Sequence, residues 1–79
     1  MEQKKVYGVM LVGCGHIGKQ HIEDIYFREN VKVVACVDYN IEPAKQFARR
    51  YGGEWDAQYG TDYKPFLSKP ELDIVIFAT

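Results

Sequence analysis

The chain has 79 residues, of which 47% are hydrophobic and 27% charged, and its formal net charge is −1. This length allows one small domain that buries only about 60% of its unfolded surface, and the composition is typical of soluble globular proteins. The balanced charge gives no reason to expect nucleic acid or an anionic membrane as a partner. No apolar run approaches the roughly 20 residues of a membrane helix. We therefore expect a small cytoplasmic domain.

The two cysteines, Cys14 and Cys36, form neither a C-x-x-C motif nor a metal-ligand spacing. We expect both to be reduced cytoplasmic thiols and predict no metal site. A catalytic thiol at Cys14 would need a nearby base, and the sequence places none beside it.

The first element is a nearly continuous apolar run over residues 7–12, which is typical of a buried parallel strand. It ends in three glycines spaced G-x-G-x-x-G. In a dinucleotide site, Gly13 permits the tight turn, Gly15 leaves room for the phosphates, and Gly18 lets the following helix pack close to the strand. The helix N-terminus adds unpaired N–H groups and the positive end of its dipole.

The helix is expected from about His16 or Ile17 to Arg28, before Glu29-Asn30 breaks the pattern. Apolar residues recur at spacings that make one face, which we expect to consist of Ile17, His21, Ile22, Ile25 and Tyr26. On this face His21 is interpreted as a hydrogen-bonded structural histidine. The side chain of His16 is expected at the loop surface, with its backbone serving the loop.

The second strand is expected at Val31–Asp38, a run rich in β-branched residues that ends in an acid. Asp38 follows Gly18 by 20 residues, where an acid accepts hydrogen bonds from the ribose hydroxyls of an adenosine. The competing interpretation is an ordinary turn residue before a helix. An acid here also repels a 2′-phosphate, and Tyr39 and Asn40 follow it in place of an arginine. NAD is therefore favoured over NADP.

A second helix is expected to begin after Asn40, a good N-cap, with Pro43 in its first turn, and to end at Gly52-Gly53. Its core face is predicted to consist of Ile41, Ala44, Phe47, Ala48 and Tyr51. A short third strand is expected around residues 56–59.

A short third helix is then expected from Thr61 or Asp62 to Leu67, and a fully apolar strand at Leu72–Ala78 closes the chain. The resulting order, β-α-β-α-β-α-β, predicts an α/β fold: half of a doubly wound fold, with a parallel sheet of about four strands in the order 3-2-1-4. Ala78 and Thr79 then lie at the ligand side of the sheet.

Three segments together resemble the N-terminal, dinucleotide-binding Rossmann domain of the Gfo/Idh/MocA oxidoreductases. They are the loop and helix start at 13–21, the acid Asp38, and the Tyr63-Lys64-Pro65-Phe66-Leu67 segment that leads into 72–79. The resemblance spans nearly the whole chain. It implies binding of NAD or NADP and a sugar, polyol or related substrate. It places pyrophosphate contacts at Gly13, Gly15, His16, Ile17 and Gly18, a ribose contact at Asp38, and cofactor-lining residues at Ala78 and Thr79.

The departure from the family pattern is in length, because the family continues with a Glu-Lys-Pro segment whose lysine helps catalysis and with a substrate domain. We therefore expect residues 1–79 to be an incomplete NAD(P)-binding domain without the catalytic domain. It would bind the adenosine-pyrophosphate half of the cofactor, contain no catalytic residue and be inactive alone. The edge of the strand at 72–78 would be exposed, and we expect self-association there.

Two alternatives remain open. One is a stand-alone nucleotide-sensing regulatory module, although such modules lack the trailing His21 and the Asp-Tyr segment seen here at 62–63. The other is a fragment of an S-adenosylmethionine-dependent methyltransferase, whose loop is usually G-x-G-x-G, a pattern that Ile17 breaks.

Overall fold

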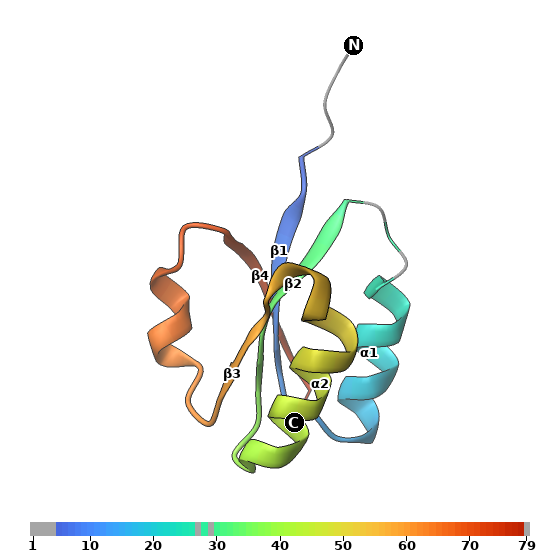
Figure 1. The fold of residues 1–79 in the computed structure, drawn as a ribbon, viewed down its shortest axis with the longest axis vertical. Coiled ribbons are helices and arrows are strands. Elements are labelled where there is room, and N and C mark those ends of the chain that lie inside the picture. The colour runs from blue at the N-terminus through green and yellow to red at the C-terminus, as the bar shows by residue number, and fades with distance from the viewer. Residues whose placement is uncertain (1–4, 27, 29, 79) are drawn as a thin grey trace.

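The computed structural model describes residues 5–26, 28 and 30–78. Its elements in chain order are β1 (Tyr7–Val12), α1 (His16–Tyr26), β2 (Val31–Val37), α2 (Ile41–Gly52), the 3₁₀ turn η1 (Gly53–Trp55), β3 (Gln58–Gly60), the 3₁₀ turn η2 (Lys64–Ser68) and β4 (Leu72–Phe77). All strand pairs are parallel and the sheet order is β3-β2-β1-β4 (Figure 1). The predicted fold class and strand order are confirmed.

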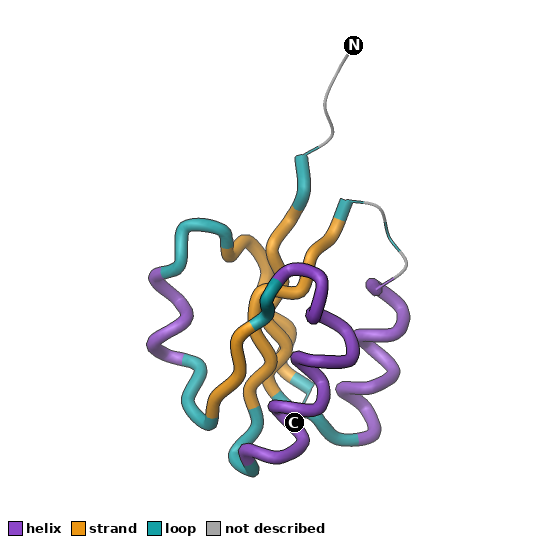
Figure 2. Tube along the Cα trace, in the orientation of Figure 1, coloured by secondary structure: helices purple, strands orange, loops and turns teal. Residues whose placement is uncertain are grey.

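The sheet is covered unequally on its two faces. Helices α1 and α2 lie on one face and η2 lies on the other (Figure 2). Each face has its own apolar cluster. The helix side contains Leu11, Cys14, Ile22, Val33, Cys36, Ala44, Ala48 and Tyr51, and the η2 side contains Met10, Val12, Val34, Ala35 and Val37. The central strands β1 and β2 contribute to both clusters, which explains why their sequences are continuously apolar.

The amino end of the sheet is held by a carboxylate in β4. The pairing of β1 with β4 shifts register between Gly8 and Val9, and there the Asp73 carboxylate accepts a hydrogen bond from the Gly8 N–H at 2.9 Å. Lys5 pairs with the same carboxylate at 3.3 Å. The Gly8 N–H, assisted by Lys5, holds the pKa of Asp73 below its ordinary value.

The boundaries of α2 agree with the prediction at both ends, since the helix runs from Ile41 to Gly52 with Gly53 as its C-cap. Asn40 caps the helix through its side chain, as expected. Gly53, however, has right-handed backbone angles and continues into η1, and the left-handed residue is Asp56, with φ of 58°. Gly52 serves packing instead, because a Cβ there would lie 2.3 Å from the Cβ of Ala57.

The predicted inward face of α1 is confirmed at Ile22, which is buried, and at Ile25 and Tyr26, which pack half-buried against the core, and it is wrong at Ile17 and His21. Ile17 is 55% exposed and His21 is also exposed, so His21 is not a buried structural histidine. The buried positions are Gly18 and Ile22. The helix ends at Tyr26 rather than at the predicted Arg28, which is not helical, and residue 27 between them lies outside the described residues.

The predictions for the third strand and the third helix also need correction. The third strand is Gln58–Gly60 rather than residues 56–59, because left-handed Asp56 cannot join a ladder. The third helix is the 3₁₀ turn Lys64–Ser68, and Asp62 accepts a hydrogen bond from its first N–H at 3.1 Å.

The last strand was predicted to reach Ala78, but β4 ends at Phe77. Its residues Ile74 and Phe77 are exposed. Within the described residues, no helix has the length and apolar content needed to cross a membrane.

Candidate functional site

The loop between β1 and α1 assigns a different task to each of its three glycines. Gly13 has φ of 104°, which side-chain-bearing residues rarely adopt. A Cβ at Gly18 would lie 1.9 Å from the carbonyl oxygen of Gly13, so helix and loop can approach this closely only with glycine there. A Cβ at Gly15 would meet no heavy atom within 4 Å. The space above Gly15 is therefore open, as the approach of a phosphate to the backbone requires.

The start of α1 adds donors at the same place. The N–H of Lys19 bonds to the carbonyl of Gly15 at 2.9 Å, so the N–H groups of His16, Ile17 and Gly18 precede the first bond of the helix and have no partner within it. The first turn contains no acidic residue. The N-terminus of α1 can therefore bind an anion without competition from a carboxylate of its own first turn.

Asp38 ties the glycine loop to the end of β2. Its Oδ2 accepts a hydrogen bond from the Cys14 N–H at 2.7 Å, and its Oδ1 accepts one from the Asn40 N–H at 2.9 Å. The side chain is thereby fixed in position, while each carboxylate oxygen retains a second lone pair for a hydroxyl donor. The residue is partly exposed, so a ligand can reach it.

These residues meet around one cavity of about 460 Å³, within the size range of small-molecule sites. Its lining consists of Val12, Gly13, Cys14, Gly15, Asp38, Tyr39, Asn40, Pro43 and Ala78. Ala78 reaches it because its N–H continues the ladder with the Val12 carbonyl at 2.8 Å.

Of the remaining predicted site residues, His16 and Ile17 begin α1 with exposed side chains outside the lining. Gly18 packs against the loop from within the helix. Thr79 lies outside the described residues.

Five lining residues, among them Tyr39 and Pro43, were not predicted as cofactor-binding residues. Tyr39 is 93% exposed beside the cavity, and Pro43 forms another part of the wall. Their position in the sequence could have identified Tyr39 and Pro43, since both follow Asp38 closely, before or within the first turn of α2.

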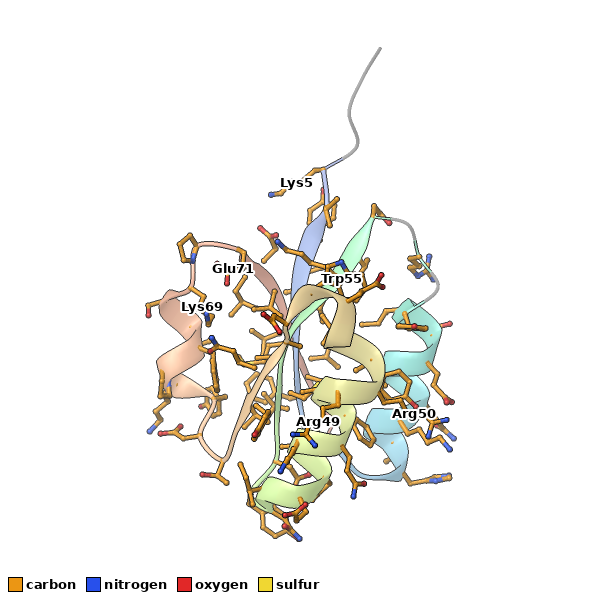
Figure 3. The ribbon with its side chains drawn as sticks, viewed as in Figure 1. Lys5, Arg49, Arg50, Trp55, Lys69 and Glu71 are labelled. Carbon is orange, nitrogen blue, oxygen red and sulfur yellow. The ribbon has the colours of Figure 1, made fainter. Side chains whose placement is uncertain are left out.

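A second cavity, of about 340 Å³, lies at the opposite end of the sheet. It is lined by Lys32, Val33, Val34, Trp55, Asp56, Gln58, Lys69 and Glu71. Trp55, Lys69 and Glu71 lie at the upper end of the view in Figure 3, away from the start of α1. Lys69 and Glu71 form an ion pair at 3.4 Å. None of the predicted site residues lines this cavity. In the described part of the chain, no group of three His, Cys, Asp or Glu residues is placed to hold a metal ion.

Comparison with known structures supports the fold. GenD2 from gentamicin A biosynthesis, solved in complex with NAD, aligns with a TM-score of 0.83 and 23% sequence identity over 100% of this chain and 22% of its own. A myo-inositol dehydrogenase from Corynebacterium glutamicum aligns with a TM-score of 0.80 and 22% identity over 94% of this chain and 21% of its own. The chain thus spans about a fifth of the length of these proteins. A 3-ketoreductase from Actinomadura kijaniata, solved with NADP, aligns with a TM-score of 0.79 and 18% identity over 95% of this chain and 23% of its own.

Family assignment rests on the sequence itself. No curated protein matches the chain. The family model described as an oxidoreductase family with an NAD-binding Rossmann fold matches residues 7–79, which is nearly the whole chain. The chain belongs to the Gfo/Idh/MocA oxidoreductase family, as a member of its NAD-binding Rossmann domains.

Proposed function

We propose that the 460 Å³ cavity binds the adenosine and pyrophosphate half of NAD. The observation that carries this proposal is the convergence of open space above Gly15, the N-terminus of α1 and the fixed carboxylate of Asp38 on one cavity. Gly15 and the first-turn N–H groups of α1 would hold the pyrophosphate. The ribose hydroxyls donate to Asp38.

The same carboxylate sets the preference for NAD over NADP. A 2′-phosphate would bring a second negative group against Asp38, and the neighbouring lining residues, Tyr39, Asn40 and Pro43, supply no cation to offset it. Of the solved structures with similar folds, one holds NAD and another holds NADP, so the fold alone does not determine which cofactor binds. We attribute the preference for NAD to the charge of Asp38.

In the whole protein we propose that this domain serves an oxidoreductase acting on a sugar, polyol or related substrate. The support is the family assignment and the names of structural neighbours, which include an inositol dehydrogenase and a 3-ketoreductase. Bound NAD accepts or donates a hydride. Hydride transfer also needs a positioned substrate and a proton acceptor or donor, and we propose that residues beyond these 79 supply them. The chain by itself binds cofactor and is inactive, and turnover of NAD with any polyol by the purified chain would refute that part.

Isothermal titration of the purified chain with NAD, NADP, AMP and S-adenosylmethionine tests the binding proposal. We expect NAD to bind and NADP to bind about tenfold more weakly or worse. AMP should compete with NAD, since it carries the same ribose. Tight binding of S-adenosylmethionine together with failure of NAD would favour a methyltransferase site and overturn the proposal.

A further inference from the structure

The second cavity exists because β3 is shorter than the strand beside it. Strand β2 begins at Val31, but β3 pairs only with its residues 35–37. Within the described residues, the first part of β2 therefore has no strand neighbour on this side. Three successive residues, Lys32, Val33 and Val34, line the cavity. Successive side chains of a strand point to opposite faces, so the cavity lies along the edge of β2 rather than over one face of the sheet.

Both walls of this cavity are fixed against the sheet. On one side, Trp55 packs against the helix-side cluster, and the chain after it is held by the bond from the Ala57 N–H to the Gly52 carbonyl at 3.0 Å. On the other side, Glu71 lies directly on β1, because a Cβ at Gly8 would come within 1.9 Å of its carbonyl oxygen. Figure 3 shows Trp55 on one side and Glu71 on the other. The cavity is thus already formed, which reduces the ordering that a ligand has to impose.

Four charged residues line the cavity, and two of them neutralise each other. The Lys69 ammonium group pairs with the Glu71 carboxylate at 3.4 Å. The backbone N–H of Glu71, followed by Lys69, holds the pKa of this carboxyl below its ordinary value, and Lys32 adds a smaller effect. In the part of the chain that the structure describes, neither Lys32 nor Asp56 forms an ion pair of its own. One ammonium group and one carboxylate of the lining therefore remain for a ligand.

The rest of the lining is apolar except for Gln58. It consists of Val33, Val34 and the ring of Trp55. The volume of about 340 Å³ is at the lower end of the range for small-molecule sites. A ligand that fits this lining is small, has an apolar body and carries one charge of each sign.

We propose that this cavity binds a free amino acid with an apolar side chain. Its carboxylate would pair with Lys32 and its ammonium group with Asp56, and its side chain would lie against Trp55 and the two valines. A ligand with a carboxylate alone would leave Asp56 unused and meet its like charge, and an amine alone would meet that of Lys32. The proposal does not rest on the cofactor function, because the two cavities share no lining residue.

Titration of the whole chain with L-leucine tests this inference. Trp55 is the only tryptophan of the sequence, so its fluorescence reports directly on the cavity. We expect a saturable change with leucine. Isocaproate, which lacks the ammonium group, and isoamylamine, which lacks the carboxylate, should bind about tenfold more weakly or worse. Glycine, which has both charges but no side chain, should also bind more weakly.

Two variants assign the charges to their partners. Lys32→Gln should weaken the binding of leucine and isocaproate about tenfold. Asp56→Asn should weaken the binding of leucine and isoamylamine to the same extent and leave isocaproate no weaker. Asparagine tolerates the left-handed backbone at this position, so the fold should persist, which circular dichroism checks. Lys64→Gln, an exposed lysine of η2 outside the lining, is the matched control and should bind leucine normally.

The outcomes separate this inference from the proposed function. Equal binding of leucine and isocaproate, leucine binding that survives both variants, or no saturable change in either fluorescence or calorimetry would overturn the amino-acid site, even if NAD binds normally. Saturable leucine binding, lost in both variants, by a chain that does not bind NAD would refute the cofactor site and leave the amino-acid site standing.

Discussion

Substitution of Gly18 by alanine should destabilise the domain, although alanine is favoured over glycine within a helix by about 1 kcal/mol. A Cβ at this position would lie 1.9 Å from the Gly13 carbonyl oxygen, and ordinary contacts begin at 3.4 Å, so helix and loop must separate by about 1.5 Å. The obstacle is backbone and cannot rotate away. Overpacking costs about 1–3 kcal/mol, and we expect the upper end here. The net loss is then about 2 kcal/mol, or roughly 10 °C in Tm for a domain of this size.

Gly15→Ala is the matched control in the same loop. Its added methyl group would meet no heavy atom within 4 Å, so stability should change by less than about 0.5 kcal/mol. The methyl group would, however, occupy the space proposed for the phosphates and weaken NAD binding about tenfold or more. Urea denaturation followed by circular dichroism measures stability, and calorimetric titration measures binding. If Gly18→Ala is as stable as the wild type, or Gly15→Ala binds NAD normally, this assignment of tasks to the glycines is wrong.

Three further predictions follow from single side chains. Asp38→Ala removes the acceptor of two backbone N–H groups, so the free energy of unfolding should fall by about 1–3 kcal/mol in urea titrations, and the preference for NAD over NADP should disappear in calorimetry. Tyr51→Phe removes the hydrogen bond to Glu23 at 3.1 Å and should cost about 0.5–1.5 kcal/mol. Burial, and after it this hydrogen bond, raises the pKa of Tyr51 in the folded protein. The stability of the wild type should therefore fall as the pH rises from about 10 through the folded pKa, and this loss should be smaller in Tyr51→Phe. In the wild type, the lowered pKa of Asp73 means that its carboxylate contributes stability that is lost as the pH falls from about 4 through this pKa. Asp73→Asn should remove part of this contribution. Asp24→Asn, in an exposed ion pair, is the control and should leave the loss of stability in acid unchanged.

The central strands could be predicted from the sequence because both of their faces are buried. The predicted bounds of β1 are those observed, and the prediction for β2 extended one residue too far, to Asp38. The last strand, β4, is also rich in apolar residues, yet its Ile74 and Phe77 are exposed. Apolar content indicates that a strand seeks burial, but only the arrangement of neighbouring elements decides whether these residues achieve it.

The rotation of α1 could not be read from its apolar pattern. Ile17 and His21 fit an inward face by spacing, yet both are exposed. The helix orientation is set by the close approach of Gly18 to the Gly13 carbonyl, which turns Gly18 and Ile22 inward. Gly18, which has no side chain, thus decides which side chains of α1 are buried. The hydropathy pattern of the helix contains no information about this close approach.

The site was predictable where it depends on local chain geometry. Glycine spacing indicated the turn, the open space and the close packing, and the distance to Asp38 indicated the acid beside the loop. The walls formed by Tyr39 and Pro43 depend on the position of α2 relative to that loop.

Chemical-shift mapping of NAD binding on the ¹⁵N-labelled chain tests the cofactor site most directly. We predict that the largest changes occur at the amides of Cys14, Gly15 and His16 and at those of Tyr39 and Asn40, and that Gly15→Ala suppresses them. Changes gathered instead around Lys32, Trp55 and Lys69 at the second cavity, or no saturable changes, would contradict the assignment of this loop as the cofactor site.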